Sequence, residues 1–328
     1  MRRGADAGEA GEGGSGIFLC TKSASARSLF TKRSRATAVN AAFSAFISIA
    51  FHGLAYAMVL YLISVGLSVT MGLMGFVNLA HGVFAAAGGY VMTRLMAAYG
   101  VPFPIAVAAA FIAVAAGGVV LERLLYRRLY GADDLAQVLM SVGLIFMSIA
   151  TAKYLWGPLA QPMAPPSYLS GQLDLGFRSF PTYRTFLIAA GAVLVTLLWL
   201  GLERTRFGAR IRAAVDNRRM AQSVGINTAT LFTATFALGS GLAGLGGALG
   251  AEILAVDPGY GLEHLVYFLI VVAVGGLGSI KGPFFAALLL GVADTGFKYL
   301  LPEFGAFFIY ALTLAILLWR PQGLFGRA

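Results

Sequence analysis

The residues with the most evident chemistry in this chain lie in one short segment, from Gly72 to Gly82. Asn78 and His81 stand there among glycines, and long apolar stretches precede and follow the segment. The amide and the neutral imidazole both offer hydrogen-bond donors and acceptors. Polar side chains and glycine-rich backbone are costly at membrane depth, so they mark a candidate pathway for a polar solute.

Two roles are open for Asn78 and His81, which are three residues apart and would share one face of a helix. In the first role, they and Gly82 line a route and offer hydrogen bonds to a zwitterion or an amide. In the second, they bond to carbonyl groups that a break in the helix leaves free. The sequence favours the second role, and in both cases substitution should impair function.

The composition predicts the environment of this segment. Hydrophobic residues make up 59% of the 328 residues, charged residues make up 12%, and the mean hydropathy is +0.80. An ordinary soluble domain has roughly 25% charged residues. We therefore expect an all-α fold, a polytopic bundle of membrane helices in the lipid bilayer. The net charge of +10 suggests no nucleic-acid partner here, because in a membrane protein the positions of Lys and Arg relative to the spans matter most.

Few residues remain for metal, redox or enzyme chemistry. His52, His81 and His264 are too scattered for a metal signature, and Cys20 is the single cysteine, so an internal disulfide is excluded. We expect neither a metal nor another cofactor. The predicted loops supply no convergent set of nucleophile, metal ligands or carboxylates, and an enzyme is therefore not expected.

The chain is predicted to have an extension followed by one membrane domain. Residues 1–38 hold seven Lys or Arg and three acidic residues without an apolar period, and we expect them to be disordered. Residues 39–328 form the membrane domain. Its expected apolar spans are residues 43–70, 83–99, 103–121, 135–156, 183–202, 231–253, 264–280, 283–301 and 304–319.

The basic residues between these spans predict the topology. They cluster after the third, fifth and last spans, and the positive-inside rule places those loops in the cytoplasm. Three full crossings before Arg123 would then put the basic amino terminus outside. Residues 72–98 are therefore expected to be a broken or re-entrant element that enters and leaves on one face, beside about eight full crossings. A translocated amino terminus is the alternative.

The loop from Leu202 to Asn227 is the most informative segment outside the spans. From Ala209 to Val224 it has neither proline nor internal glycine, and apolar residues alternate with arginines, which predicts one short amphipathic helix ended by Gly225. Such a helix docks in a groove of a partner protein or lies on anionic lipid. The small apolar face favours the protein partner.

Glycines and one charge pair mark the carboxyl-terminal half. Gly275 and Gly276 follow an apolar run, and a tight turn or close helix packing accounts for them better than a dinucleotide-binding fingerprint, because the next segment is itself a span. Asp294 and Lys298 are four residues apart and should pair within a span. A series of small residues is read as a helix-packing face in preference to a pore lining: Gly239, Gly241, Gly244, Gly246, Gly247 and Gly250.

Four motifs in order resemble the permease subunits of branched-chain amino acid ABC importers. The family's Asn-Phe-Ala-His-Gly signature resembles Asn78 to Gly82, and its Gly-Gly-x-Gly-Ser-x-x-Gly turn resembles Gly275 to Gly282. Its cytoplasmic coupling loop is similar to Gly208-Ala-Arg-Ile-Arg-Ala with Asp216-Asn217, and its ending is similar to Arg320-Pro-Gln-Gly-Leu-Phe-Gly326. The motifs cover residues 43–327. The chain departs from the family at Leu79, where phenylalanine is usual, and at Lys281, where proline is common.

The resemblance implies a transport subunit of a prokaryotic inner membrane, without an ATPase of its own. Its partners would be a second homologous permease, cytoplasmic ATP-binding subunits and an external solute-binding protein. No phosphate-binding Gly-x-x-x-x-Gly-Lys-Ser/Thr loop occurs in the chain. The substrate pathway would include Asn78, His81, Gly82, Gly275 and Gly276. The loop coupling to the ATPase would include Arg210, Asp216, Asn217, Ala221 and Gly225.

The expected function is therefore the import of leucine, isoleucine and valine. Import of urea or short amides by the same machinery is the first alternative, since related permeases share these motifs. An ion-coupled transporter or channel is the alternative from another class. Ion coupling predicts transport by the isolated chain along an imposed gradient, whereas the importer predicts none without its ATPase.

Overall fold

The computed structural model describes residues 16–74, 76, 78–174, 178–276, 278–279 and 281–326, with side chains from residue 43 onward except those of residues 73, 74 and 306. The chain divides into two compact units, residues 1–48 and residues 49–328. We describe each unit by itself.

The first unit contains the start of helix α1 (Gly16–Met74). Residues 16–38 are thus helical, where the composition predicts disorder, and residues 1–15 lie outside the described residues. A physical reason is that residues 17–52 contain neither glycine nor proline, the two residues that most disfavour a helix.

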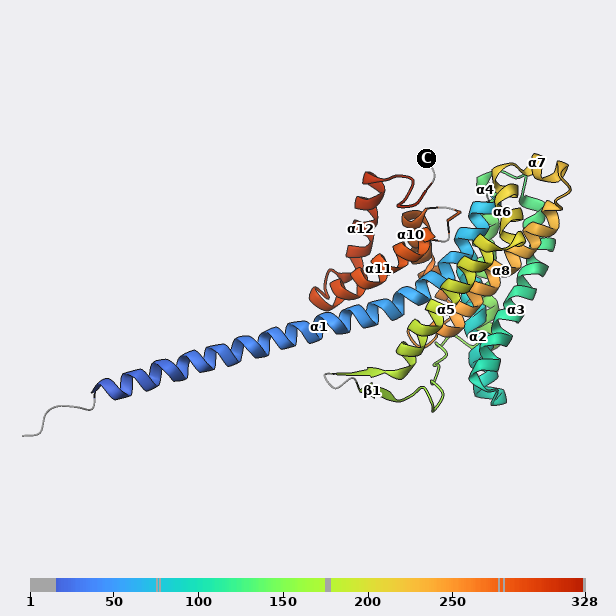
Figure 1. Cartoon of the computed structure of the whole chain (residues 1–328). Helices are drawn as coiled ribbons and strands as arrows, with labels where there is room; N and C mark the ends of the chain where they lie inside the picture. The colour runs from blue at the N-terminus through green and yellow to red at the C-terminus, as the bar shows by residue number, and fades with distance from the viewer. Residues whose placement is uncertain are drawn as a thin grey trace, which may run out of the picture. The chain divides into compact units, whose positions relative to one another are not determined.

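The second unit is a bundle of helices (Figure 1). After the remainder of α1, its long helices are α2 (His81–Tyr99), α3 (Phe103–Leu124), α4 (Asp134–Trp156), α5 (Thr182–Arg204), α8 (Thr228–Gly250), α10 (Leu265–Gly275), α11 (Lys281–Leu300) and α12 (Gly305–Trp319). Short elements join them: η1 (Tyr126–Leu129), α6 (Arg206–Asp216), α7 (Arg218–Ser223) and α9 (Tyr260–Glu263). Strands β1 (Gln172–Asp174) and β2 (Ser179–Pro181) form an antiparallel hairpin between the expected spans 135–156 and 183–202.

The helices agree with a polytopic membrane protein. Five helical stretches of the described chain are long and apolar enough to cross a bilayer, namely residues 43–72 and helices α3, α4, α5 and α8. The stretches Tyr260–Gly275 and Phe307–Trp319 are apolar but shorter, and they correspond to two further expected spans. Helices α2 and α11 have 19 and 20 residues, and they carry the charged residues Arg94, Lys281, Asp294 and Lys298.

The bundle has two ends, which are defined by their side chains. At one end, Gly72 of α1, Leu202 of α5 and Ile211 of α6 line the same crevice. This end also carries the arginines that follow α3 and α5, and we call it the arginine end. At the other end, the His52 side chain of α1 contacts Arg184 at the start of α5. We call it the His52 end.

The chain passes between these ends three times before the first arginine cluster. From Ile49, α1 runs to the arginine end, and α2 returns to the His52 end, where Phe103 at the start of α3 packs against Tyr183. Helix α3 then runs back to the arginine end. The expected return of residues 72–98 to the same face is therefore wrong, because Gly72 lies at the arginine end whereas α2 finishes at the His52 end, just before Phe103. Ile49 thus lies at the end opposite the arginine-rich loops.

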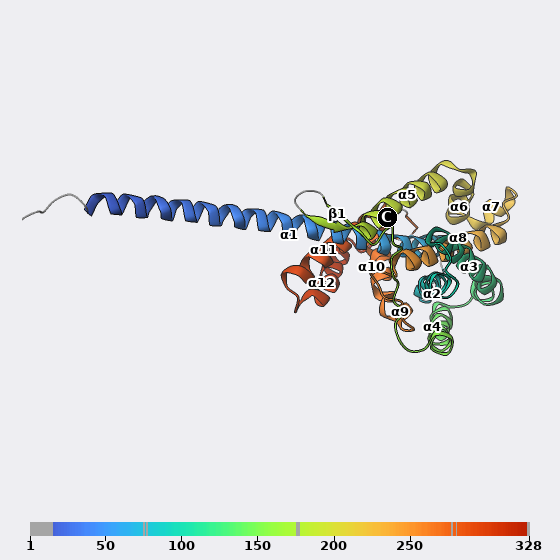
Figure 2. The same cartoon turned by 90° about the horizontal axis from the view of Figure 1, so that it is seen from below.

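The expected interruption itself is confirmed. Helix α1 ends at Met74 and α2 begins at His81, and the described residues between them form no helix. Viewed from below, α2 lies among α3, α4 and α8 (Figure 2). Its side chains agree with this position, since the Tyr90 ring stacks on Trp156 of α4 at 4.5 Å and Phe84 contacts Phe236 of α8 edge-on.

The glycine series of α8 is a packing face, as predicted. A Cβ atom on Gly244 would lie 2.7 Å from Cβ of Val114, and one on Gly239 would lie 2.7 Å from Cγ2 of Thr70. Real Cβ atoms do not approach other atoms so closely, so helices α1 and α3 pack against α8 at backbone distance. Helix α8 is correspondingly central, because 83% of the residues in its most apolar 18-residue stretch are buried, against 22% in each of α3, α4 and α5.

Candidate functional site

Asn78 lies in the break between α1 and α2 and is 2% exposed. Its Oδ1 accepts hydrogen bonds from the Ala80 amide at 3.1 Å and from the Tyr126 hydroxyl at 3.0 Å. These bonds hold the turn that opens α2, but Oδ1 accepts them from an amide and a hydroxyl, so they are not the expected bonds to freed carbonyl groups. The amide nitrogen Nδ2 of Asn78 is buried and has no hydrogen-bond partner in the described part of the chain, so a donor remains for another group.

His81 and Gly82 begin α2 at the depth of the middle of α1. The His81 ring is 1% exposed, and its Nε2 lies 2.9 Å from the carbonyl oxygen of Ile63. The carbonyl can only accept, so Nε2 carries the hydrogen atom. A Cβ on Gly82 would lie 2.6 Å from the carbonyl oxygen of Gly261, just after α9 begins. The start of α2 is thus held between α1 and α9.

Gly275 and Gly276 form a turn at the arginine end, apart from the contacts that hold Asn78 and His81. Gly276 has a φ of 96°, which favours glycine. A Cβ on Gly275 would lie 2.5 Å from the amide nitrogen of Pro283. The carbonyl oxygens of Val274 and Gly275 accept hydrogen bonds from Leu324 and Phe325. The turn and the carboxyl-terminal motif of the chain therefore stabilise each other.

The expected amphipathic helix is present as two helices, α6 and α7, with Asn217 between them. Asn217 has extended backbone, and its Oδ1 accepts a hydrogen bond from the Met220 amide at 3.0 Å. The prediction of one continuous helix was wrong because asparagine favours an N-cap over a helix interior. Gly225, with a φ of 85°, follows α7 as predicted.

Helix α6 is anchored to the end of α5. The Arg212 guanidinium donates hydrogen bonds to the Leu202 and Glu203 carbonyl oxygens, and the Gly208 backbone packs against Leu202. A crevice of about 340 Å³ beneath α6 is bordered by Glu203 and Lys281, whose charged groups pair at 3.0 Å. Movement of α6 is thus linked to α5 and to the start of α11.

The two faces of the α6–α7 segment differ. Ile211, Ala214 and Ala221 are buried against the bundle. The exposed residues of the segment include Arg210, Asp216 and Asn217 and three apolar side chains, which are Val215 (44%), Met220 (63%) and Val224 (70%). Val215 and Asp216 also line the crevice beneath α6. Exposed apolar side chains that gather outside the spans are typical of a surface that binds a protein. We call these six exposed residues the outer coupling surface.

The structure also shows a buried carboxylate that the sequence analysis missed. Glu122, near the end of α3, is 1% exposed. Its two oxygens accept hydrogen bonds from the Tyr130 hydroxyl at 2.7 Å and from the Thr233 hydroxyl at 2.8 Å. Burial and the hydrogen bond to Glu122 raise the pKa of the Tyr130 phenol, so it stays protonated and keeps donating. In the sequence, an acidic residue next to the expected span 103–121 is the signal that could have drawn attention to this site.

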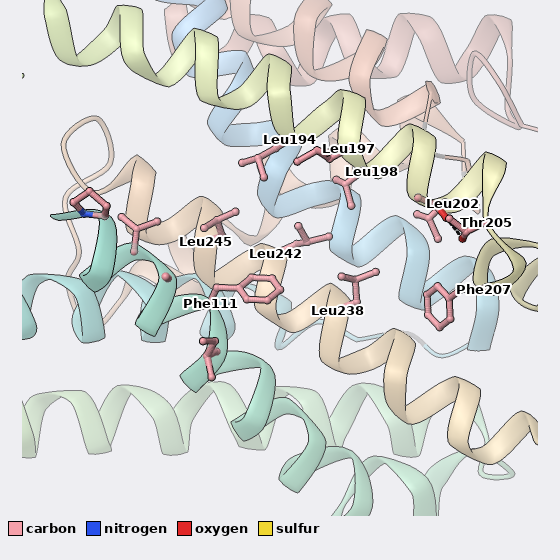
Figure 3. A pocket seen from close by; sticks show the side chains of 15 residues that line it. Phe111, Leu194, Leu197, Leu198, Leu202, Thr205, Phe207, Leu238, Leu242 and Leu245 are labelled. Atoms are coloured by element: carbon pink, nitrogen blue, oxygen red, sulfur yellow. Dashed lines mark hydrogen bonds between the residues drawn. The ribbon is translucent and has the colours of Figure 1, made fainter. Parts of the chain in front are cut away.

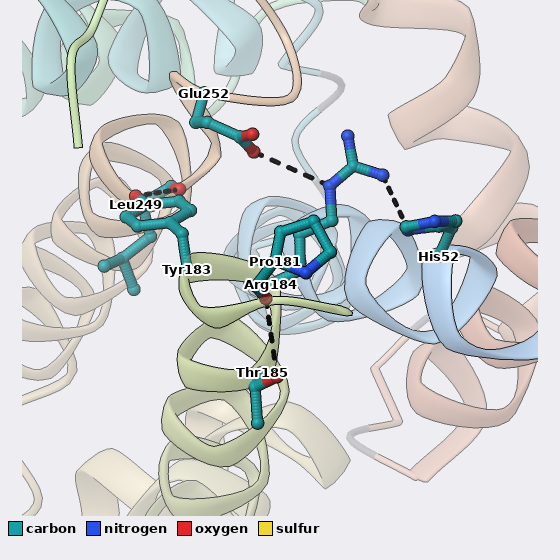
Figure 4. A network of polar contacts seen from close by, with 7 residues as sticks. All are labelled: His52, Pro181, Tyr183, Arg184, Thr185, Leu249 and Glu252. Carbon is teal, nitrogen blue, oxygen red and sulfur yellow. Dashed lines mark hydrogen bonds and ion pairs between the residues drawn. The ribbon is translucent and has the colours of Figure 1, made fainter. Parts of the chain in front are cut away.

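A second polar network lies at the His52 end (Figure 4). The Arg184 Nη1 atom lies 2.7 Å from Nδ1 of His52, and its Nε atom lies 3.9 Å from the Glu252 carboxylate. The neighbouring Tyr183 hydroxyl donates to the Leu249 carbonyl oxygen at 2.8 Å. These contacts tie α1, α5 and the end of α8 together.

An apolar groove of about 770 Å³ lies between α3, α5 and α8 (Figure 3). Leu194, Leu198 and Leu242 line its middle, and Thr205 and Phe207 lie at the arginine end. This lining cannot satisfy the charges of a zwitterion. Asp294 and Lys298, by contrast, pair within α11 at 2.7 Å, which confirms the predicted charge pair.

Comparison with known proteins identifies related chains over most of the sequence. The family model described as the permease component of branched-chain amino acid transport systems matches residues 49–317. The permease protein BraD of Pseudomonas aeruginosa, named for high-affinity branched-chain amino acid transport, is 30% identical over 282 residues, which cover 81% of this chain and 91% of BraD.

Two further relatives carry the same description. The permease protein LivH of Escherichia coli K12 is 28% identical over 293 residues, covering 84% of this chain and 94% of LivH. The permease protein LivM of the same organism is 26% identical over 290 residues, covering 81% of this chain and 68% of LivM. No solved structure matches the chain significantly.

Proposed function

The chain belongs to the family of permease components of branched-chain amino acid transport systems, and from this premise we propose that it moves leucine, isoleucine and valine as one subunit of an ATP-driven importer. The related BraD and LivH proteins are named for high-affinity transport of these amino acids. In this proposal the chain supplies the route through the membrane, and separate subunits hydrolyse ATP.

The observation that carries the proposal is the outer coupling surface. It lies at the arginine end, which the positive-inside rule assigns to the cytoplasm of the inner membrane. Its exposed apolar side chains are Val215, Met220 and Val224, and because lipid binding strengthens with the apolar area that is inserted, so small an apolar area favours a protein partner over lipid. The partner is a cytoplasmic ATP-binding subunit whose closure moves α6 and α7 as a rigid body. Arg210, Asp216, Asn217, Ala221 and Gly225 are the proposed coupling residues.

The remaining partners follow from the same arrangement. The matches to both LivH and LivM support pairing with a second, homologous permease. An external solute-binding protein would deliver the amino acid at the His52 end, where Arg184 and Glu252 are partly exposed. Asn78, His81 and Gly82, with the turn at Gly275 and Gly276, are the proposed pathway residues. The unpartnered Nδ2 of Asn78 supports a hydrogen bond to the passing solute.

The proposal is tested by uptake in cells that carry the whole import system with or without this chain. Loss of labelled leucine uptake on removal of the chain is the expected result. Loss of urea uptake with unchanged leucine uptake would move the substrate to urea, and uptake by the chain without the ATP-binding subunits would reject the ATP-driven mechanism. Substitution of Asp216, Asn217 or Gly225 should leave the protein in the membrane but separate ATP hydrolysis from uptake.

A further inference from the structure

A continuous series of side-chain contacts begins at α7, between α5 and α8 in the chain, and continues into the bundle. The guanidinium carbon of Arg218 lies 4.9 Å from the centre of the Phe232 ring at the start of α8, which is a cation–π contact. The Phe232 ring meets the Tyr130 ring edge-on, with 6.1 Å between the ring centres. A displacement of α7 therefore acts directly on Phe232 and Tyr130.

Tyr130 is held in one position by Glu122. Its hydroxyl donates to Oε1 of Glu122, and the Thr233 hydroxyl donates to Oε2. A buried carboxylate without donors would be strongly destabilised, so Glu122 holds both hydroxyl groups close. These hydrogen bonds connect α3, α8 and the loop after η1.

From Tyr130 the contacts continue to the break before α2. The Phe76 ring meets the Tyr130 ring at 6.2 Å and the Tyr126 ring at 5.2 Å, in both cases nearly perpendicular. The Tyr126 hydroxyl then bonds to Oδ1 of Asn78, which also accepts from the Ala80 amide. Phe76, Tyr126 and Asn78 are all buried, so a shift of one ring cannot be absorbed by empty space.

We propose that these contacts form a relay that transmits the movement of α7 to the break between α1 and α2, with Glu122 and Tyr130 as its positioning residues. The relay rests on the proposed function, because a partner ATPase supplies the movement. In this relay, Asn78 both holds the turn that opens α2 and responds to the position of the α6–α7 segment. The relay cluster consists of Arg218, Phe232, Tyr130, Phe76, Tyr126 and Asn78.

Spatial continuity alone does not establish coupling, so the test must measure coupling. The complete importer, with its second permease and ATP-binding subunits, is reconstituted in vesicles with the solute-binding protein. Leucine uptake and ATP hydrolysis are measured in the same preparation and expressed as leucine moved per ATP. Tyr130→Phe removes a single hydroxyl, Glu122→Gln removes the charge, and Arg218→Ala removes the first contact. Tyr99→Phe, at an exposed position near the other end, is the matched control.

The expected result is that Tyr130→Phe and Arg218→Ala each lower the leucine moved per ATP about fivefold or more, as in typical allosteric coupling. The double variant should be no worse than the worse single variant, because both break the same series of contacts. The Glu122→Gln variant should retain part of the leucine moved per ATP, because its amide oxygen still accepts a hydrogen bond from one hydroxyl group. Tyr99→Phe should leave the ratio unchanged.

The relay is rejected if the Tyr130 and Arg218 effects on this ratio multiply as independent changes do. It is also rejected if the variants lower assembly, hydrolysis and uptake together at a constant ratio, since this indicates a structural role. Failure of the unmodified complex to move leucine with ATP would instead reject the proposed function. If a variant complex cannot be assembled, Thr233→Val replaces it, because this change removes the second hydroxyl that bonds to Glu122 and leaves Tyr130 intact. The leucine moved per ATP is then measured for Thr233→Val and decides in the same way.

Discussion

The Tyr126 hydroxyl donates a hydrogen bond of 3.0 Å to Oδ1 of Asn78, although the two residues are 48 positions apart in the chain. The bond joins the start of η1 to the break that precedes α2. Both side chains are buried, with Tyr126 fully so. The position of the break is therefore set by a residue outside it.

Tyr126→Phe should weaken this connection without leaving a cavity. A hydrogen bond in a protein contributes about 1 kcal/mol, and Asn78 keeps its bond from the Ala80 amide. We expect a loss of roughly 1 kcal/mol in the free energy of unfolding, measured by thermal unfolding in detergent, and reduced leucine uptake. Tyr99→Phe, at an exposed site, is the control. Equal stability of the two variants would contradict the assigned role.

Asn217→Ala should loosen the start of α7, because the variant no longer accepts a hydrogen bond from the Met220 amide. Loss of an N-cap costs about 1 kcal/mol. Faster hydrogen exchange at the amides of residues 218–223 is the expected result, together with weaker binding of the ATP-binding subunit. Asn217→Ser keeps a capping oxygen and should behave like the unmodified chain. If the serine and alanine variants exchange equally fast, the cap is not what orders α7.

Met220→Asp should weaken binding of the ATP-binding subunit and leave the permease folded. Met220 is 63% exposed on the outer coupling surface, so a charged side chain there stays hydrated in the isolated chain and hardly changes its stability. In an apolar contact with a partner the charge would lose its water, which costs binding free energy. Co-purification of the subunit, measured beside the amount of permease in the membrane, checks this expectation. Leu173→Asp adds the same charge at an exposed apolar site in β1 and should have no effect. Normal co-purification of the Met220 variant would place the contact elsewhere.

The sequence predicts those features that depend on neighbouring residues. The break near Asn78, the turn at Gly276 and the pair of Asp294 and Lys298 can be inferred because each signal lies within a few residues. Composition likewise suffices for the helical membrane fold. The division of the expected amphipathic helix into α6 and α7 at Asn217 was missed because the residues on both sides of Asn217 favour a helix. Only the preference of asparagine for the N-cap position indicates a break there.

The contacts of Glu122 could not be inferred, because its partner Thr233 is 111 residues away. A single glutamate near the end of a span looks like a solvated residue until the fold brings two hydroxyl groups to it. The passage of α2 to the far end was also missed. Its glycines and polar residues suggest a helix that turns back, whereas they are accommodated by close contacts, such as Gly82 against Gly261.

The adjacent residues Gly117 and Gly118 of α3 allow a sharp test of the packing against α8. A Cβ on Gly118 would lie 2.8 Å from Cβ of Ser240, whereas one on Gly117 would meet no atom within 4 Å. Gly118→Ala should therefore force α3 away from α8 and cost about 1 to 3 kcal/mol. Gly117→Ala should be neutral or slightly stabilising, because alanine favours the helix. Thermal unfolding of both variants in detergent measures the difference, and a Gly118 variant as stable as the Gly117 variant would show that α3 and α8 do not approach at backbone distance.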